Sequence, residues 1–251
     1  MILALLLAIA PKVVIVSANE TTFTYRDHFE TKTEQRVPHD SHVISVLFIG
    51  NSLTYFNEMP RMLSAMAARE NKPLLVEQET PSGMTLEDHW LRTDALRRIW
   101  SEHWDYVILQ DRSGRWSIDH SDLFHQYLMM FGDQIRRSGA KPVLFQTWYP
   151  GNDDFFRAAA KRENVLLLPV GRAWKKEYGW DGTHPNLFGS YLIACSVFAM
   201  VYDKPPIGLR FDFRDLADTH EFFDAPMVRQ SLDRLTADEI GRSAWNAREK
   251  R

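Results

Sequence analysis

The chain has 251 residues, of which 45% are apolar and 25% charged, as in a globular protein that buries a sizeable core. Thirty basic and thirty-three acidic side chains give a net charge of −3, which excludes the basic surface typical of nucleic-acid-binding proteins. The single cysteine, Cys195, excludes an internal disulfide and a cysteine-rich zinc site. It lies in an apolar run, so we interpret it as a buried small hydrophobic residue.

The N-terminus begins with an apolar run at residues 2–10, which Pro11 and Lys12 interrupt well short of the ~20 residues that a membrane span needs. Small residues follow at positions 16–18, as a signal peptidase requires. This predicts a signal peptide at residues 1–18, cleaved after Ala18, and a secreted or periplasmic protein without a membrane span in the mature chain. No Lys or Arg precedes the run, so an uncleaved membrane anchor is the alternative.

Residues 19–42 are polar and show no apolar period, so we expect a leader that is disordered or ordered only on contact. From residue 43 on, short apolar runs alternate with longer segments of 3.6-residue period. The runs predict strands at residues 43–49, 74–77, 106–110, 142–147 and 165–169. Helical periods separate the strands, and a last apolar helix is expected from Leu187 to Tyr202.

Alternating strands and helices are typical of βαβ units, so residues 43–202 predict one α/β domain with a parallel sheet and helices on both faces. Beyond Tyr202 the pattern weakens at Pro205 and Pro206, and residues 232–248 predict a charged terminal helix. We therefore expect residues 203–251 to be a C-terminal extension that packs on the domain or trails from it.

Two motifs near expected strand ends carry the residues of nucleophilic catalysis. Ligands of open parallel sheets bind beyond the carboxyl ends of the strands. Residues 50–54, GNSLT, would turn the chain there and point the Ser52 hydroxyl at the crevice, near the amides of a helix start. An ordinary serine helix cap is the alternative.

The second motif, DGTHPN at residues 181–186, precedes the last apolar helix. It places Asp181 three residues before His184, so that the carboxylate can orient an imidazole that removes the proton of a serine. A loop aspartate with an incidental histidine is the alternative.

The order Ser, Asp, His across residues 43–202 resembles the SGNH hydrolases, also called GDSL esterases and lipases. GNSL at residues 50–53 matches the first block, with Asn51 in place of the commoner Asp, and PSG at 81–83 supplies the glycine of the second. DGTHP at 181–185 is the most specific match. The third block departs: relatives carry Gly-x-Asn-Asp after the third strand, whereas QDRS stands here at 110–113, as in a divergent branch of the family.

The resemblance implies a three-layer α/β/α domain with a flavodoxin-like five-stranded sheet, and acyl transfer through a covalent seryl ester. Ser52 would attack the ester carbonyl after His184 removes its proton, with Asp181 orienting the imidazole. The backbone amides of Ser52 and Gly83 and the side chain of Gln110 would form the oxyanion hole, Gln110 offering the family's asparagine amide one methylene further out. The sequence GND at 151–153 also resembles the third block, but it follows the fourth strand rather than the third. We interpret it as a turn and helix cap.

Substrate clues come from polar and aromatic side chains near the strand ends, and Asn51, Arg112 and Trp148 are the candidate substrate-binding residues. Aromatic faces beside polar groups suit a sugar ring, although core or rim packing is their ordinary role. We expect cleavage of a small-molecule or carbohydrate ester, most simply removal of acetyl or other short acyl groups. Lipid or aryl ester hydrolysis, O-acyl transfer with the same triad, and carbohydrate binding without catalysis are the alternatives.

The densest cluster of potential metal ligands is Asp119, His120, Asp122 and His125. Histidines five residues apart lie on different helix faces and match no common ligand spacing. We interpret the cluster as a solvated helix start, and the glycines form no dinucleotide-binding motif, so no metal or other cofactor is expected.

Overall fold

The computed structural model describes residues 13–18, 21–27, 30–37, 40, 42–209, 211 and 232–248. At its centre is a parallel five-stranded sheet with strand order β5-β4-β6-β7-β8. In chain order the strands are β4 (Ile44–Ile49), β5 (Leu74–Glu79), β6 (Tyr106–Leu109), β7 (Lys141–Phe145) and β8 (Leu166–Leu168). All five predicted strands are present with ends shifted by at most two residues, so the predicted α/β class is confirmed.

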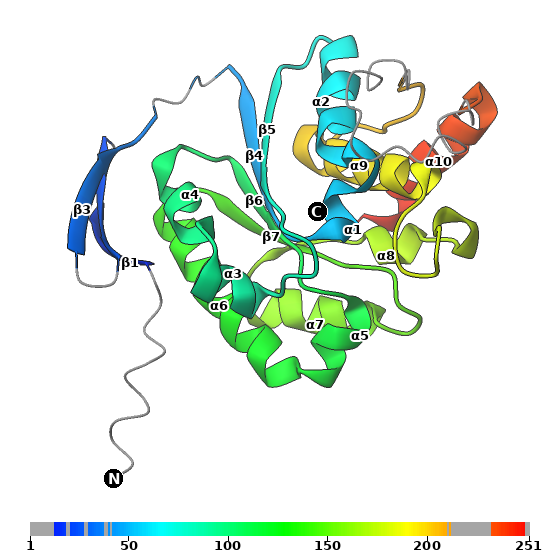
Figure 1. The fold of residues 1–251 in the computed structure, drawn as a ribbon. Coiled ribbons are helices and arrows are strands. Elements are labelled where there is room, and N and C mark those ends of the chain that lie inside the picture. The colour runs from blue at the N-terminus through cyan, green and yellow to red at the C-terminus, as the bar shows by residue number, and fades with distance from the viewer. Residues whose placement is uncertain are drawn as a thin grey trace.

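Helices cover both faces of this sheet and make three layers (Figure 1). One face carries α2 (Met59–Arg69), α8 (Val170–Ala173), α9 (Leu187–Tyr202) and α10 (Arg234–Ala247). The other carries α3 (Leu86–Arg92), α4 (Ala95–Ser101), α6 (Ser121–Arg137) and α7 (Asp153–Arg162). Short elements follow the carboxyl ends of the strands, namely α1 (Ser52–Tyr55), η2 (Phe56–Glu58), α5 (Gly114–Asp119) and η3 (Lys176–Tyr178).

The central strand β4 shows why the strands read as continuous apolar runs. Val46 and Phe48 point into the core beneath α2 and α9, whereas Leu47 and Ile49 point into the core beneath α3, α4 and α6. All four are buried, because helices exclude water from both faces of the sheet. Because all five strands run parallel, their carboxyl ends lie at one edge of the sheet, and Ser52 and His184 meet at this edge.

Helix α9 is apolar around nearly its whole circumference because it lies between the sheet, α2 and α10. Cys195 sits in this helix and is buried, as predicted. Burial raises the pKa of its thiol far above the ordinary range, which leaves it unreactive.

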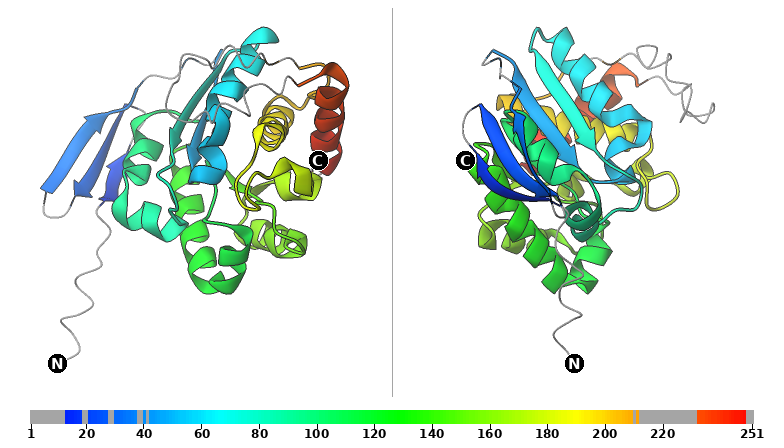
Figure 2. Two further views of the ribbon diagram at one scale, coloured as in Figure 1. Left: turned by 45° about the vertical axis from the view of Figure 1, so that its right-hand side comes forward. Right: turned by 60° about the vertical axis from the view of Figure 1, so that its left-hand side comes forward.

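The N-terminal segment, for which the sequence predicted a leader that is disordered or ordered only on contact, contains three strands. β1 (Val13–Ala18), β2 (Thr22–Asp27) and β3 (Glu30–Gln35) form a separate antiparallel sheet beside α4 (Figures 1 and 2). Threonine and aromatic residues in β2 favour strands, and Phe23 is fully buried in the core beneath α4. Residues 1–12 of the predicted signal peptide lie outside the described residues, and its last six residues form β1.

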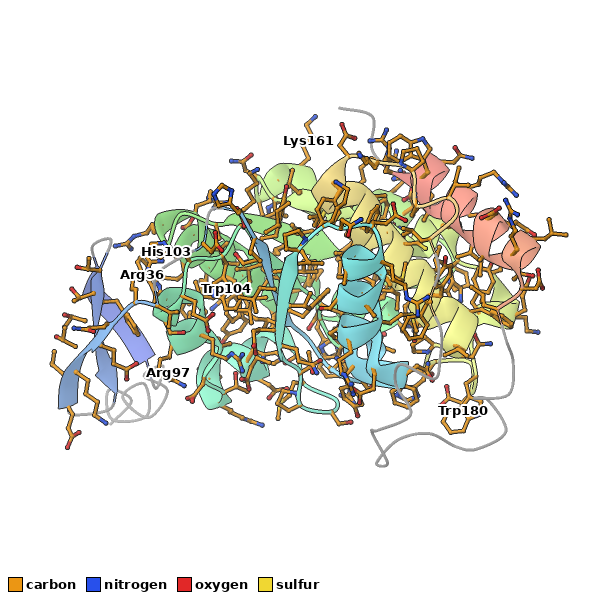
Figure 3. The ribbon with its side chains drawn as sticks, turned by 90° about the horizontal axis from the view of Figure 1, so that it is seen from above. Arg36, Arg97, His103, Trp104, Lys161 and Trp180 are labelled. Atoms are coloured by element: carbon orange, nitrogen blue, oxygen red, sulfur yellow. The ribbon has the colours of Figure 1, made fainter. Side chains whose placement is uncertain are left out.

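Arg36 anchors this segment to the domain. Its guanidinium donates to the carbonyl oxygens of Trp100 (3.1 Å), Glu102 (3.1 Å) and Ser138 (3.0 Å), and burial lowers its pKa. Figure 3 shows Arg36 at the junction between the small sheet and the helices. The backbone amide of Val37 adds a hydrogen bond of 2.8 Å to the Ser101 carbonyl.

The C-terminal extension is described at residues 203–209, 211 and 232–248, and the predicted terminal helix is α10, which packs on α9 (Figure 2). Lys175 pairs with Glu239 of α10 at 2.7 Å, and Arg172 donates to the Ala247 carbonyl at 2.8 Å. Among the residues with described coordinates, no helix is long and apolar enough to cross a membrane.

Candidate active site

The nucleophile candidate lies at the turn between β4 and α1. Asn51 caps α1 by accepting a hydrogen bond from the Leu53 amide (3.0 Å), so Ser52 is the first helical residue rather than the cap. Its side chain is therefore left available, and Ser52 Oγ lies 3.0 Å from His184 Nε2. Two residues 132 positions apart meet at the carboxyl edge of the sheet.

Asp181 bonds to the other ring nitrogen of His184 and so completes a hydrogen-bonded relay of Ser52, His184 and Asp181. His184 Nδ1 donates to Asp181 Oδ2 at 2.7 Å, which fixes the tautomer with the Nε2 lone pair facing Ser52. The other oxygen, Oδ1, accepts from the backbone amides of His184 (2.7 Å) and Thr183 (2.9 Å). Partial burial raises the pKa of Asp181, but these amide bonds and the imidazole outweigh burial and lower the pKa to about 2. The carboxylate is therefore charged throughout the ordinary pH range.

Neighbouring loops hold His184 in place. The ring of Phe56 stacks on the imidazole, with centroids 4.4 Å apart and an interplanar angle of 16°. Trp148 donates through its indole nitrogen to the Thr183 carbonyl at 2.8 Å, and the Trp180 amide donates to the His184 carbonyl at 2.8 Å. The side chain of Trp180 is 52% exposed and projects from the surface beside the site (Figure 3).

A buried network lies beneath the nucleophile turn. Gln110 Oε1 accepts from the Asn51 amide and from the Thr54 hydroxyl, each at 2.9 Å. His89 donates from Nε2 to the Gly50 carbonyl at 2.7 Å, and burial lowers the pKa of its imidazole, which keeps it neutral. Gly50 is required, because a Cβ there would lie 2.7 Å from Gln110 Oε1. The network holds the Ser52 backbone in one conformation.

This arrangement does not fit the role that the sequence suggested for Gln110 as an oxyanion donor. Gln110 is fully buried, and its amide nitrogen donates to the Asp111 carbonyl. Its oxygen must face the Asn51 amide, which is itself a donor, so a flipped side chain is excluded. The extra methylene relative to asparagine lets the side chain fold back under the turn.

Two backbone amides remain as candidates for the predicted oxyanion hole. In the described part of the chain, no acceptor meets the amide of Ser52 at the start of α1, or that of Gly83. Gly83 has a φ of +71°, which favours glycine in this turn. Asn51 Nδ2 donates to the Met84 carbonyl at 2.8 Å and joins the Gly83 turn to the nucleophile turn.

The three residues predicted to bind substrate have different surroundings. Asn51 is buried, and its side chain caps α1 and joins loops, so it supports the site. Arg112 is exposed, with its guanidinium 4.8 Å from the centroid of the Trp116 ring. Trp148 is half-buried, stacked on Trp174 at 3.7 Å.

The sequence analysis missed several supporting residues. Phe56 and His89 act through partners distant in the sequence, so no local pattern marks them. Asp111 is also buried; burial raises the pKa of its carboxyl, which accepts from the Leu86 amide (3.0 Å) and the Ser117 hydroxyl (2.8 Å). The one available signal was its place directly after β6.

Three of the possible metal ligands at 119–125 each contact a different partner. Asp119 pairs with Arg115 at 2.6 Å, His120 stacks on Trp116, and His125 contacts Glu163 at 3.1 Å. Within the described residues, no group of three or more side chains is arranged to hold a metal ion. The GND segment contains the expected turn at Gly151, but Asn152 occupies the cap position of α7 without a capping hydrogen bond and donates instead to the Thr147 carbonyl at 2.8 Å.

No protein-family model and no curated protein sequence matches the chain, whereas solved structures do. A protein from Slackia heliotrinireducens, provisionally described as an SGNH hydrolase, is 28% identical over 61% of this chain and 95% of its own, with a TM-score of 0.52. The esterase EstA from Pseudoalteromonas sp. is 15% identical over 63% and 97% (TM-score 0.51). TesA is 20% identical over 64% and 99% (TM-score 0.50).

The three-layer fold and a serine, histidine and aspartate in hydrogen-bonding contact at the strand ends define the class of α/β/α serine hydrolases. The structural matches narrow the fold: the chain shares the fold of the SGNH/GDSL-type hydrolases, and it is 28% identical over 61% of its length to a protein provisionally described as one.

Proposed function

We propose that this chain is a secreted serine esterase that removes acetyl or other short acyl groups from carbohydrates, with Ser52 as nucleophile, His184 as general base and Asp181 as the group that orients it. The proposal rests above all on the relay from Ser52 Oγ to His184 Nε2 (3.0 Å) and from His184 Nδ1 to Asp181 Oδ2 (2.7 Å). Each distance lies within the range for proton transfer and ring orientation.

In the first half of the reaction, Ser52 Oγ bonds to the ester carbonyl carbon while its proton passes to His184 Nε2. The carbonyl π electrons move to oxygen, where the amides of Ser52 and Gly83 donate to the negative charge. When this intermediate collapses, the bond to the alcohol breaks and the alcohol oxygen takes the proton from His184. Water repeats the sequence on the seryl ester, releasing the acid and restoring the Ser52 hydroxyl.

The carbohydrate part of the proposal is supported by the aromatic side chains around the site. Trp180 is exposed next to Phe56, with ring centroids 6.2 Å apart, and Trp148 contacts the loop of the general base. Exposed aromatic rings are costly in water and suit the apolar faces of sugar rings. Lipid and aryl esters share the reaction chemistry and are distinguished by a substrate panel.

The test of nucleophile identity is labelling with a fluorophosphonate, followed by mapping of the modified residue. We expect Ser52 to be labelled in the wild type, and Ser52→Ala to lose both labelling and hydrolysis of p-nitrophenyl acetate while keeping its circular dichroism spectrum. Ser196→Ala is the matched control, because Ser196 is a buried serine of α9 that donates to the Leu192 carbonyl of its own helix and lies outside the relay. Unchanged turnover in Ser52→Ala would overturn the proposal.

Export is tested separately, by N-terminal sequencing of protein recovered outside the cytoplasm. A mature chain that begins at residue 19 supports the predicted cleavage after Ala18. Such cleavage removes β1, so an uncut chain whose small sheet is complete would contradict it.

A further inference from the structure

A hollow lies beside the loop that carries Asp181 and His184, here called the catalytic loop. It has a volume of about 440 Å³, within the range of small-molecule sites, and it is open to solvent. Its walls come from the loop after β7 (146–153), from α8, and from the segment between α8 and the catalytic loop. Gly179 and Gly182 are the nearest lining residues in sequence to Asp181 and His184, which do not line it themselves.

The hollow lies at the same edge of the sheet as the nucleophile but at a distance from it. In the strand order, β6 separates β4, which precedes Ser52, from β7, which precedes the hollow. Since neighbouring strands are about 4.8 Å apart, β4 and β7 are about 10 Å apart in the sheet. Ser52, Asp181 and His184 do not line the hollow, so a group bound there lies beside the ester under attack and can belong to the same extended substrate.

Aromatic side chains form much of the wall. Trp148 and Trp174 stack with ring centroids 3.7 Å apart and an interplanar angle of 5°, and Tyr149 follows Trp148 on the same loop. Trp148 also reaches the catalytic loop through its hydrogen bond to Thr183. One residue therefore contacts both the hollow and the segment that carries the general base.

Gln146 supplies an unsatisfied polar atom. It lines the hollow and is fully buried, and its amide nitrogen donates to Asn152 and Asp153. These bonds fix the orientation of the amide, and Oε1 has no hydrogen-bond donor among the described residues. Because this oxygen is also inaccessible to solvent, it leaves a polar atom behind the wall rather than one exposed to a ligand.

The charged residues of the lining are Arg172, Lys176 and Asp153, and they favour a polar ligand over an alkyl chain. Arg172 contributes a cation, but its Nε and Nη2 lie 3.1 and 3.0 Å from Asp153 Oδ1, so the pair is balanced. An alkyl chain would desolvate this pair without replacing its hydration, whereas hydroxyl groups can bond to it.

We propose that the hollow is a sugar-ring subsite, in which the aromatic walls hold the ring next to the one that bears the ester. The inference rests on the proposed carbohydrate esterase function and extends it, because the preferred substrate becomes an acylated disaccharide or longer chain rather than a single acylated sugar.

The first test compares two substrates of different length. We measure kcat/KM for an acetylated cellobiose and for p-nitrophenyl acetate, and express the result as their ratio. Trp174→Ala and Tyr149→Ala each remove part of the wall, and each should lower the ratio at least five-fold through KM for the disaccharide. Trp245→Ala on α10 is the control, since this half-buried tryptophan does not line the hollow and should leave the ratio unchanged. A ratio that stays constant in both wall variants would overturn the subsite.

The second test does not depend on turnover. Saturation-transfer NMR with methyl glycosides of glucose, xylose, galactose and N-acetylglucosamine is applied to Ser52→Ala, which keeps the hollow intact. Saturation of at least one glycoside that disappears in Ser52→Ala/Trp174→Ala supports the subsite even if the wild type cleaves no ester, in which case only the esterase proposal fails. No saturation of any glycoside, or saturation that Trp174→Ala leaves intact, overturns the subsite even if the chain is an active esterase.

Discussion

Ser52 differs from an ordinary helix-start serine because its cap function has been taken over by its neighbour. Asn51 accepts from the Leu53 amide, so the Ser52 hydroxyl is left to meet His184. At the same time Gln110 and His89 hold the two ends of the peptide group between Gly50 and Asn51 through buried hydrogen bonds. A nucleophile held in this way needs little reorganisation to reach the attacking geometry.

At the same scale, Asp181 should stabilise the folded protein at neutral pH and lose this effect in strong acid. Its pKa falls from an ordinary 3.8 to about 2, chiefly because the amide and imidazole of His184 outweigh burial. A depressed pKa gives stability that is fully present above the unfolded value and is lost as the pH falls through the folded value. The melting temperature of Asp181→Asn should therefore lie below that of the wild type at pH 7, and the difference should shrink as the pH falls from 3.8 to about 2.

The same variant should lose activity, by about 10⁴-fold in kcat, because asparagine does not hold the imidazole in the required tautomer. Asp154→Asn is the control: this side chain is almost fully exposed on α7, and its removal should change neither readout. A melting-temperature difference between Asp181→Asn and the wild type that persists unchanged at pH 2 would contradict the role of the charged carboxylate.

Gln110 gives a prediction that separates support from oxyanion binding. Gln110→Met keeps the volume but leaves the buried Asn51 amide and Thr54 hydroxyl without their acceptor. We expect the free energy of unfolding, measured by urea titration, to fall by about 2–4 kcal/mol. Gln78→Met, at a half-buried glutamine that accepts from Thr80, should cost much less. Loss of kcat with unchanged stability is the signature of a direct oxyanion donor, and would show that our assignment is wrong.

At the scale of elements, α10 shows a tertiary contact overriding a local preference. Helix propensity alone predicts that Gly241→Ala stabilises α10 by about 1 kcal/mol. However, a Cβ at Gly241 would lie 2.4 Å from the Pro206 carbonyl oxygen, and a backbone atom cannot move aside cheaply.

We therefore expect Gly241→Ala to lower the free energy of unfolding by about 1–3 kcal/mol, as overpacked sites do, when measured by urea titration. Ser243→Ala on the same helix is the control, since this residue is only half-buried and alanine is the better helix former. A stabilised Gly241→Ala would show that α10 does not pack on residues 206–207 as described.

In the small N-terminal sheet, too, tertiary contacts decide what the local sequence does not indicate. Among the described side chains of this segment, Phe23 and Arg36 are buried against the main domain, the ring in the core beneath α4 and the guanidinium on three carbonyl groups. Neither residue is part of a hydrophobic repeat, because isolated buried side chains produce no period. The polar composition of β3 is that of a strand whose side chains are mostly exposed.

At the scale of the whole molecule, sheet order decides which loops form the site. β4 pairs with both β5 and β6, so the turn after β4 lies between the Gly83 turn and the loop after β6. The loop with Asp181 and His184 follows the far strand β8, yet it returns across the edge to Ser52. An extended route along this edge, from Ser52 towards β8, is where the proposed sugar subsite lies.

The sequence by itself determined the α/β class, the five strands and the motifs around Ser52 and His184, because hydrophobic period and short turn motifs are local properties. Tertiary structure alone decided that Gln110 folds under the nucleophile turn, that Phe56 stacks on His184 and that Phe23 enters the core. Each of these contacts joins residues that are distant in the chain or set by a side-chain rotamer. Their energy depends on burial and on partners that no local pattern encodes.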